Sequence, residues 1–140
     1  MALILSTLKT ELTTDPNVYG YAPHVASGNT GTLAALLNET RATINVPRGL
    51  VGTWEIIAAT DGAEYGALNA TAKDIYKTLV SAGTVDVADA QIQAILKTLF
   101  PSPSTTRTNL IARLTRPGSR AEQLFGGGVT HADCARALAS

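Results

Sequence analysis

The sequence predicts an all-α fold: a compact multi-helix single domain over residues 1–140, with about seven short helices and at most a token β-strand. Leu, Ile and Ala recur at three- and four-residue spacing along most of the chain, which is the period of a helix with one buried face. Turns rich in Gly, Pro, Asn and Asp separate these segments. A chain of 140 residues buries roughly two thirds of its unfolded surface, so it needs neither metal nor disulfide to fold.

In the first third of the chain, Leu5, Leu8 and Leu12 predict a helix over residues 3–13. A short apolar helix is expected to end near Asn38, and residues 43–46 alternate polar and β-branched side chains in the manner of a strand. The apolar start of the chain, residues 1–5, is too short to span a membrane.

Pro47 suits the first turn of the next predicted helix. The apolar residues after it follow the pattern of a core-facing helix despite two glycines; they are Leu50, Val51, Trp54, Ile57 and Ala58. Trp54 is the single tryptophan, and we expect it to be a central packing anchor rather than a binding hot spot.

Three further helices are predicted between residues 69 and 116. Asn69 and Asp86 are the expected N-caps of the first two. The polar break at residues 101–104 precedes the third, which is expected to end at Arg116-Pro117-Gly118.

The segment from Ser119 to Leu138 contains two helix-start signatures separated by three glycines. Ser119 precedes Glu122 and Thr130 precedes Asp133 at capping-box spacing. The glycines end one helix and allow a sharp turn. We interpret the segment as a helical corner that either closes the core or docks on a neighbour.

No catalytic, cofactor or metal site is predicted. His131 and Cys134 are one helical turn apart, but the chain has no second pair of ligands to complete a zinc site. The glycines at 126–128 are not followed by the Lys-Ser/Thr of a phosphate loop. The single cysteine excludes an intrachain disulfide and is expected to be a small buried group.

Only 16% of the residues are charged, against roughly 25% in typical soluble domains. The charges are also unevenly distributed: residues 61–96 carry two basic and five acidic groups, and residues 97–140 carry six basic and two acidic groups. Ordinary solvated surface, an acidic protein partner and DNA all explain the basic third, in that order of preference. The candidate contacts in it are Arg107, Arg113, Arg116 and Arg120.

The loop predicted over residues 15–29 is the other candidate assembly contact, because it is long and rich in Gly and Tyr. Its candidate residues are Tyr19, Tyr21 and His24. A lid of tyrosines over the core is the preferred interpretation over a ligand platform. We expect deletion of residues 19–24 to impair assembly more than folding.

The chain resembles a family of small proteins from tailed bacteriophages. The matching segments are Leu8–Pro16, Tyr19–Ala22, Leu36–Asn38 with Arg41, Ser119–Leu124 and Ala135–Ala137. It departs from the family pattern at residues 125–128, where a longer apolar-glycine run is expected, and at Cys134.

The resemblance implies a non-enzymatic structural protein of the virion, made in the host cytoplasm. A head-to-tail connector in the neck is the first expectation, with other virion proteins such as portal, tail or capsid as partners. A capsid decoration protein or a tail accessory protein is the alternative within this class. The charge split suits head-to-tail contacts between identical subunits. A helical nucleic-acid-binding module that uses the basic third is the alternative from another class; no membrane partner is expected.

Overall fold

The computed structural model describes residues 3–140, which form ten helices and four short strands. Helices account for 59% of the chain, so its helical character is confirmed. The prediction of a purely all-α fold needs correction, because the strands form two small sheets and the fold is mixed. Met1 and Ala2, the start of the apolar N-terminal segment, lie outside the described residues. No helix of the described part is long and apolar enough to cross a membrane.

The chain divides into two compact units, each with its own hydrophobic core. Unit 1 comprises the chain up to Val46 and from Pro117 onward, and unit 2 comprises Pro47–Arg116. The single domain predicted over residues 1–140 therefore has two cores. The Pro-rich break at residues 101–104 lies inside unit 2, and the chain passes from one unit to the other within strands.

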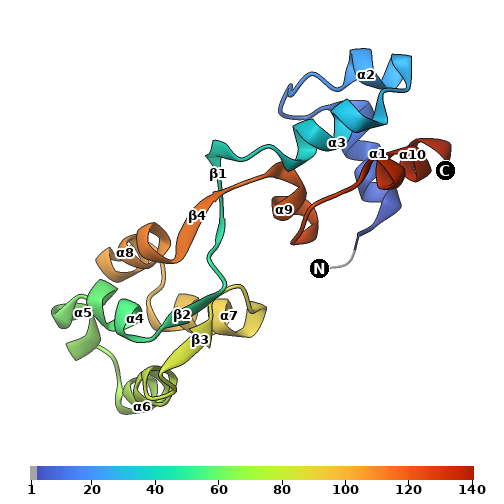
Figure 1. The fold of residues 1–140 in the computed structure, drawn as a ribbon. Helices are drawn as coiled ribbons and strands as arrows, with labels where there is room; N and C mark the ends of the chain where they lie inside the picture. Colours follow the sequence, from blue (N-terminus) through green and yellow to red (C-terminus); the bar gives the residue numbers. More distant parts are fainter. Residues whose placement is uncertain (1–2) are drawn as a thin grey trace. The chain divides into compact units, whose positions relative to one another are not determined.

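Five helices form unit 1: α1 (Leu5–Thr14), α2 (Ala22–Ser27), α3 (Thr30–Asn38), α9 (Arg120–Phe125) and α10 (His131–Ala139) (Figure 1). Helix α10 packs against both α1 and α3, so the first and last helices of the chain lie side by side. Leu8 and Leu12 of α1 are buried in this core with Leu33 and Leu37 of α3, as their helical spacing predicts.

Two strands carry the chain between the units and pair with each other: β1 (Arg41–Pro47) and β4 (Thr115–Gly118). The extended segment predicted at residues 43–46 is confirmed in β1. The predicted helix-ending turn at residues 116–118 is instead part of β4. Gly118 is required there, because a Cβ atom at this position would lie 2.6 Å from Cγ2 of Val46.

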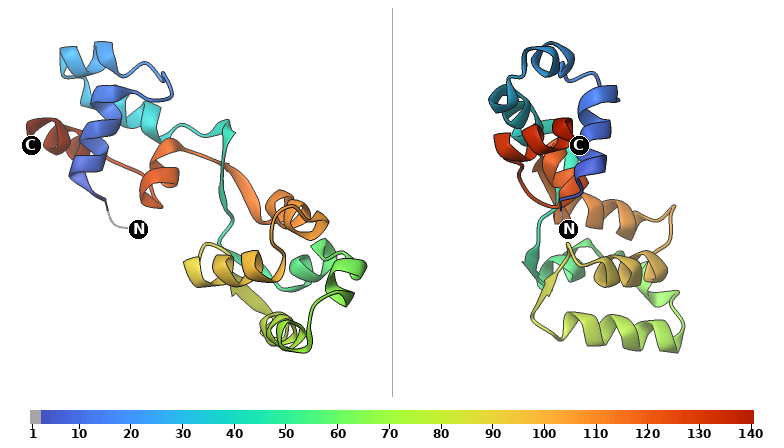
Figure 2. Two further views of the ribbon diagram at one scale, coloured as in Figure 1. Left: turned by 180° about the vertical axis from the view of Figure 1, so that it is seen from behind. Right: turned by 90° about the vertical axis from the view of Figure 1, so that its right-hand side faces the viewer.

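Unit 2 contains five helices and a two-stranded sheet (Figures 1 and 2). Its elements are β2 (Leu50–Gly52), α4 (Trp54–Ala59), α5 (Gly62–Gly66), α6 (Ala70–Val80), β3 (Thr84–Asp86), α7 (Ala90–Leu99) and α8 (Thr105–Leu114). Strands β2 and β3 are antiparallel, with Val51 opposite Val85, and both valines are buried. Tyr76 of α6 lies in the core, between the rings of Tyr65 and Phe100.

Three of the four predicted N-caps are confirmed. Asn69 accepts a hydrogen bond from the backbone of Ala72, and both predicted capping boxes, at Ser119 and Thr130, are complete. The prediction that Asp86 caps α7 is wrong. Asp89 is the cap, because Asp86 ends strand β3.

The corner formed by α9 and α10 closes the core of unit 1. Phe125 and Cys134 are buried, and Leu124 and Leu138 pack against the same core. The side-chain amide of Asn38 fixes the turn between the two helices: it donates to the carbonyl of Val129 at 2.7 Å and accepts from its N–H at 2.9 Å. Of the two predicted roles for this segment, closing the core is the one that these contacts support.

Candidate functional site

The carboxylate of Asp15 organises the segment that was predicted as a loop over residues 15–29. It accepts hydrogen bonds from the backbone N–H groups of Tyr19 at 2.7 Å and Gly20 at 2.9 Å. The chain then enters α2 at Ala22. The segment is therefore held by its own hydrogen bonds within unit 1.

This turn points the side chain of Tyr21 into the core, where it is fully buried. The ring of Tyr19 packs edge-on against it, with 6.0 Å between the ring centroids, and lies under the guanidinium of Arg41. The predicted lid of tyrosines matches these contacts. Deletion of residues 19–24 would remove the fully buried Tyr21 from the core, so we now expect it to impair folding as well as assembly. His24, half-buried in α2, is the remaining candidate of this segment.

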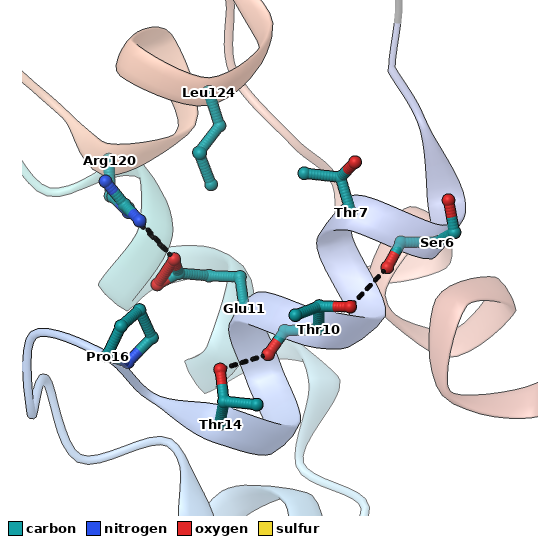
Figure 3. A pocket seen from close by; sticks show the side chains of 8 residues that line it. All are labelled: Ser6, Thr7, Thr10, Glu11, Thr14, Pro16, Arg120 and Leu124. Atoms are coloured by element: carbon teal, nitrogen blue, oxygen red, sulfur yellow. Dashed lines mark hydrogen bonds and ion pairs between the residues drawn. The ribbon is translucent and has the colours of Figure 1, made fainter.

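Arg120, another predicted contact, is used inside unit 1. Its Nη2 and Nε atoms lie 2.6 and 2.8 Å from Oε1 of Glu11 (Figure 3). The hydroxyl of Tyr21 donates to Oε2 of the same carboxylate. Only 3% of the Glu11 side chain is exposed. The hydrogen bonds to Glu11 raise the pKa of Arg120, while burial, followed by the Glu11 charge, raises the pKa of Tyr21.

A shallow depression adjoins this ion pair on the surface of unit 1 (Figure 3). The hydroxyls of Thr10 and Thr14 on its wall donate to the carbonyls one turn earlier in α1, at Ser6 and Thr10. The guanidinium of Arg120 is already bound to Glu11. These polar groups are thus satisfied by the chain itself, and the cluster acts as a structural brace between α1 and α9.

The other predicted arginines, Arg107, Arg113 and Arg116, lie in unit 2. Arg107 is half-buried in the first turn of α8, and Arg113 is exposed in its last turn. Arg116 is exposed in β4 and has an interaction partner in the chain. Arg120 therefore belongs to unit 1 and the other three to unit 2, so the basic third of the sequence is divided between the two units.

Trp54 is 64% exposed, so the prediction that it is a central packing anchor is wrong. The predicted helical pattern began at Leu50, but residues 50–52 form strand β2 and the helix begins only at Trp54. A strand alternates its side chains from one side to the other, which changes which residues face inward. Val51 is buried as a result, whereas Leu50 is 72% exposed.

The two neighbours of Trp54 in the sequence hold it outward. Thr53 is buried and donates its hydroxyl to the carbonyl of Val80 at 2.7 Å. Glu55 is buried on the other side, 2.7 Å from Nη1 of Arg48, which also donates to the carbonyl of Arg113 at 2.9 Å. Because both flanking side chains point inward with partners, the indole is directed to the surface.

We define the Trp54 patch as Leu50, Gly52, Trp54 and Ile57, with the guanidinium of Arg113 at its edge. The indole lies over Gly52, where a Cβ atom would come within 2.6 Å of its Cδ1 atom. Leu50 is on the same side of β2 as Gly52, and Ile57 is one turn along α4 and 52% exposed. The guanidinium carbon of Arg113 is 6.0 Å from the centre of the indole ring. The patch joins an exposed aromatic ring, flanked in the sequence by two buried residues, to apolar neighbours and a positive charge.

The glycines at 49 and 52 are the sequence signal that could have located this patch. A core-facing helix is weakened by two glycines within four residues, whereas a turn and a strand that lies beneath an indole ring accommodate them. Gly49 has a φ of 94°, a left-handed conformation that favours glycine. The buried Thr53 and Glu55 carry no such signal, because their inward orientation depends on partners distant in the sequence.

Among residues 3–140, no group of three or more His, Cys, Asp and Glu side chains has the geometry of a metal site. His131 is exposed in the first turn of α10, and Cys134 is buried in the core of unit 1. Burial raises the pKa of the Cys134 thiol, which disfavours the reactive thiolate. The buried position matches the prediction for this residue.

The chain was compared with protein-family models, curated proteins and solved structures. No family model matches the chain, and no curated protein or solved structure matches it either.

Proposed function

We propose that this chain is a non-enzymatic structural protein of a tailed-phage particle, and that it serves as a head-to-tail connector subunit in the neck. The resemblance supplies the class of protein. The structural observation that supports it is the Trp54 patch. Exposed aromatic and apolar groups that lie together are typical of protein–protein contacts.

The construction of the patch supports an interaction role. Its ring is mounted between two buried, hydrogen-bonded residues, Thr53 and Glu55. A side chain that is already rigid loses little conformational entropy when it is buried by a partner. Trp and Arg are also the residues most often found at the energetic centre of interfaces. A subunit that acts through protein contacts requires such a surface.

The nucleic-acid alternative receives less support from the arginines. Arg120 is bound to Glu11 and Arg136 to Asp133, so these two charges are compensated within the chain. Binding to duplex DNA with a steep dependence on salt would favour this alternative over the connector.

The test is quantitative mass spectrometry of purified particles of the phage that encodes the chain, with the wild type and the Trp54→Ala variant. We expect the wild type at the copy number of a single ring and the variant depleted from particles. Lys97→Ala, a change at an exposed residue of the same unit, is the matched control and should be incorporated normally.

A copy number large enough to coat the capsid would show that the chain is a capsid decoration protein rather than a connector. Absence of the wild-type chain from particles would contradict a structural role in the virion.

A further inference from the structure

A groove between α6 and α7 forms a second apolar surface on unit 2. Two adjoining depressions make up this groove, and both are lined by Ile75 of α6 and Ile95 of α7. Leu79 lies in the first depression and Leu99 in the second. Ile75 is 43% exposed. We call this surface the α6–α7 groove.

The groove has an acidic edge. Asp74 lines it one residue before Ile75 and is exposed. Within residues 3–140, no ion pair or hydrogen bond engages the Asp74 carboxylate. The only other polar groups on this side of the groove are the threonines of α6, Thr71 and Thr78. The groove is thus a concave apolar surface beside one uncompensated negative charge.

The Trp54 patch has the complementary properties. It is an exposed apolar surface, and the guanidinium at its edge, that of Arg113, has no carboxylate partner in the described chain. We propose that the Trp54 patch of one copy of this protein docks in the α6–α7 groove of a second copy, with Arg113 facing Asp74. Apolar burial supplies the affinity, and the opposite charges set the orientation.

This contact joins two different surfaces of the same unit, so every copy offers both halves. Such a heterologous contact repeats from one copy to the next, and it closes into a ring when the rotation between copies allows. This inference rests on the proposed connector function, because a neck adaptor is a ring of subunits and the contact would join one subunit to the next. Both surfaces belong to unit 2.

A patch-to-patch dimer is the competing arrangement. Asp86 lies opposite Leu50 in the β2–β3 sheet, on the same face, and would meet Arg113 of the other copy. Its carboxylate already accepts a hydrogen bond from the N–H of Ala88 at 2.9 Å. The unpartnered Asp74 therefore fits Arg113 better, and the experiment below separates the two arrangements.

The test is sedimentation velocity of the full-length chain over a concentration series, with charge-reversal variants. Arg113→Glu and Asp74→Lys should each weaken self-association by roughly tenfold. The double variant Arg113→Glu/Asp74→Lys restores opposite charges across the contact and should associate like the wild type. An equimolar mixture of the two single variants should also associate more tightly than either variant alone.

Asp86→Lys separates the two arrangements, because Asp86 is exposed and lies beside Leu50 of the Trp54 patch but outside the groove. It should not weaken self-association, because a positive charge beside the patch does not repel the acidic edge of the groove. Lys97→Ala, at an exposed residue that lines neither depression, is the matched control and should leave self-association unchanged. Circular dichroism spectra confirm that each variant is folded before its association is compared. Weakening by Asp86→Lys with no effect of Asp74→Lys would overturn the inference in favour of the dimer, and a chain that remains monomeric at all concentrations would overturn it outright.

The outcomes distinguish this inference from the proposed function. A chain that is found in particles but fails the charge-reversal test keeps its structural role and loses the self-docking contact. A chain that passes the charge-reversal test but is absent from particles keeps the contact and loses the connector role.

Discussion

Glu11 is a carboxylate held in the interior of unit 1, and its neutralisation depends on Arg120. A buried charge without a partner is strongly destabilising, because water no longer solvates it. We therefore expect Arg120→Met to lower the free energy of unfolding by about 2–3 kcal/mol, a range reduced from that of fully buried pairs because Arg120 retains 17% exposure. Urea denaturation at neutral pH measures this change.

The control is the double variant Glu11→Gln/Arg120→Met. It removes the buried charge together with its partner and leaves an oxygen for the hydroxyl of Tyr21, so it should recover most of the lost stability. A double variant as unstable as the single one would show that Arg120 acts through packing rather than through the ion pair.

Glu64 gives unit 2 a stability that depends on pH. Its carboxylate accepts hydrogen bonds from the backbone of Thr105 at 3.0 Å and Thr106 at 2.6 Å, at the start of α8. Hydrogen bonding from the Thr106 side chain and backbone lowers the pKa of Glu64 below the ordinary 4.5. A carboxyl group whose pKa is lower in the folded chain than in the unfolded chain stabilises the fold when the pH is above its unfolded-state pKa. This stabilisation is lost as the pH falls through the folded-state pKa.

Glu64→Gln should therefore reduce stability more at pH 7 than at pH 3, because pH 3 lies below the ordinary pKa of 4.5 and part of the stabilisation has already been lost there. Denaturant unfolding of both proteins at the two pH values measures the difference. An equal loss at both would mean that the charge of Glu64 is not responsible.

At the scale of single elements, the capping box of α10 shows how local sequence determines a helix start. The Thr130 hydroxyl accepts from the N–H of Asp133 at 3.1 Å, and the Asp133 carboxylate accepts from the N–H of Thr130 at 3.0 Å. Thr130→Ala removes one of these bonds and should cost about 1 kcal/mol of unfolding free energy.

Thr130→Ser retains the hydroxyl and should stay close to the wild type in the same denaturation experiment. Because Thr130 is exposed, neither substitution leaves a cavity. Equal stability of the alanine and serine variants would contradict a capping contribution.

The same local chemistry explains which elements the sequence predicts. Asn69, Ser119 and Thr130 act on backbone groups two or three residues away, so their roles are visible in the sequence alone. Strand β2 is different, because it exists only through its pairing with β3, more than thirty residues later. Without that pairing the segment from Leu50 follows a helical pattern, and the orientation of Trp54 is predicted incorrectly.

At the scale of the whole molecule, the division into two cores was not visible in the sequence. Both cores contain the same aliphatic residue types, and the crossing points at Val46–Pro47 and Arg116–Pro117 lie in strands rather than in a flexible linker. Of the candidate contacts predicted from the sequence, only Arg113 lies in the Trp54 patch. Trp54 itself, at the centre of the patch, was predicted to be buried.

Unit 2 is one continuous segment whose core consists of its own residues. Its ends meet, since the N–H of Arg48 donates to the carbonyl of Leu114 at 2.8 Å. We expect a fragment of residues 47–116 to fold alone, with a helical circular dichroism spectrum and a cooperative thermal transition. A fragment of residues 1–46 lacks α9 and α10 and should remain largely unfolded.

An unfolded 47–116 fragment would show that unit 2 depends on unit 1. At this length a core provides only a few kcal/mol of stability, so the measurement is best made at low temperature and low denaturant concentration.

The most direct test of the Trp54 patch as the assembly contact uses its own fluorescence, because Trp54 is the only tryptophan. In dilute protein the emission should be that of a water-exposed indole, and it should shift to shorter wavelength as the protein concentration is raised and copies associate. The Asp74→Lys variant should show the shift only at higher concentration. Association without any change in emission would contradict the account, because the indole would then remain exposed to water in the assembly.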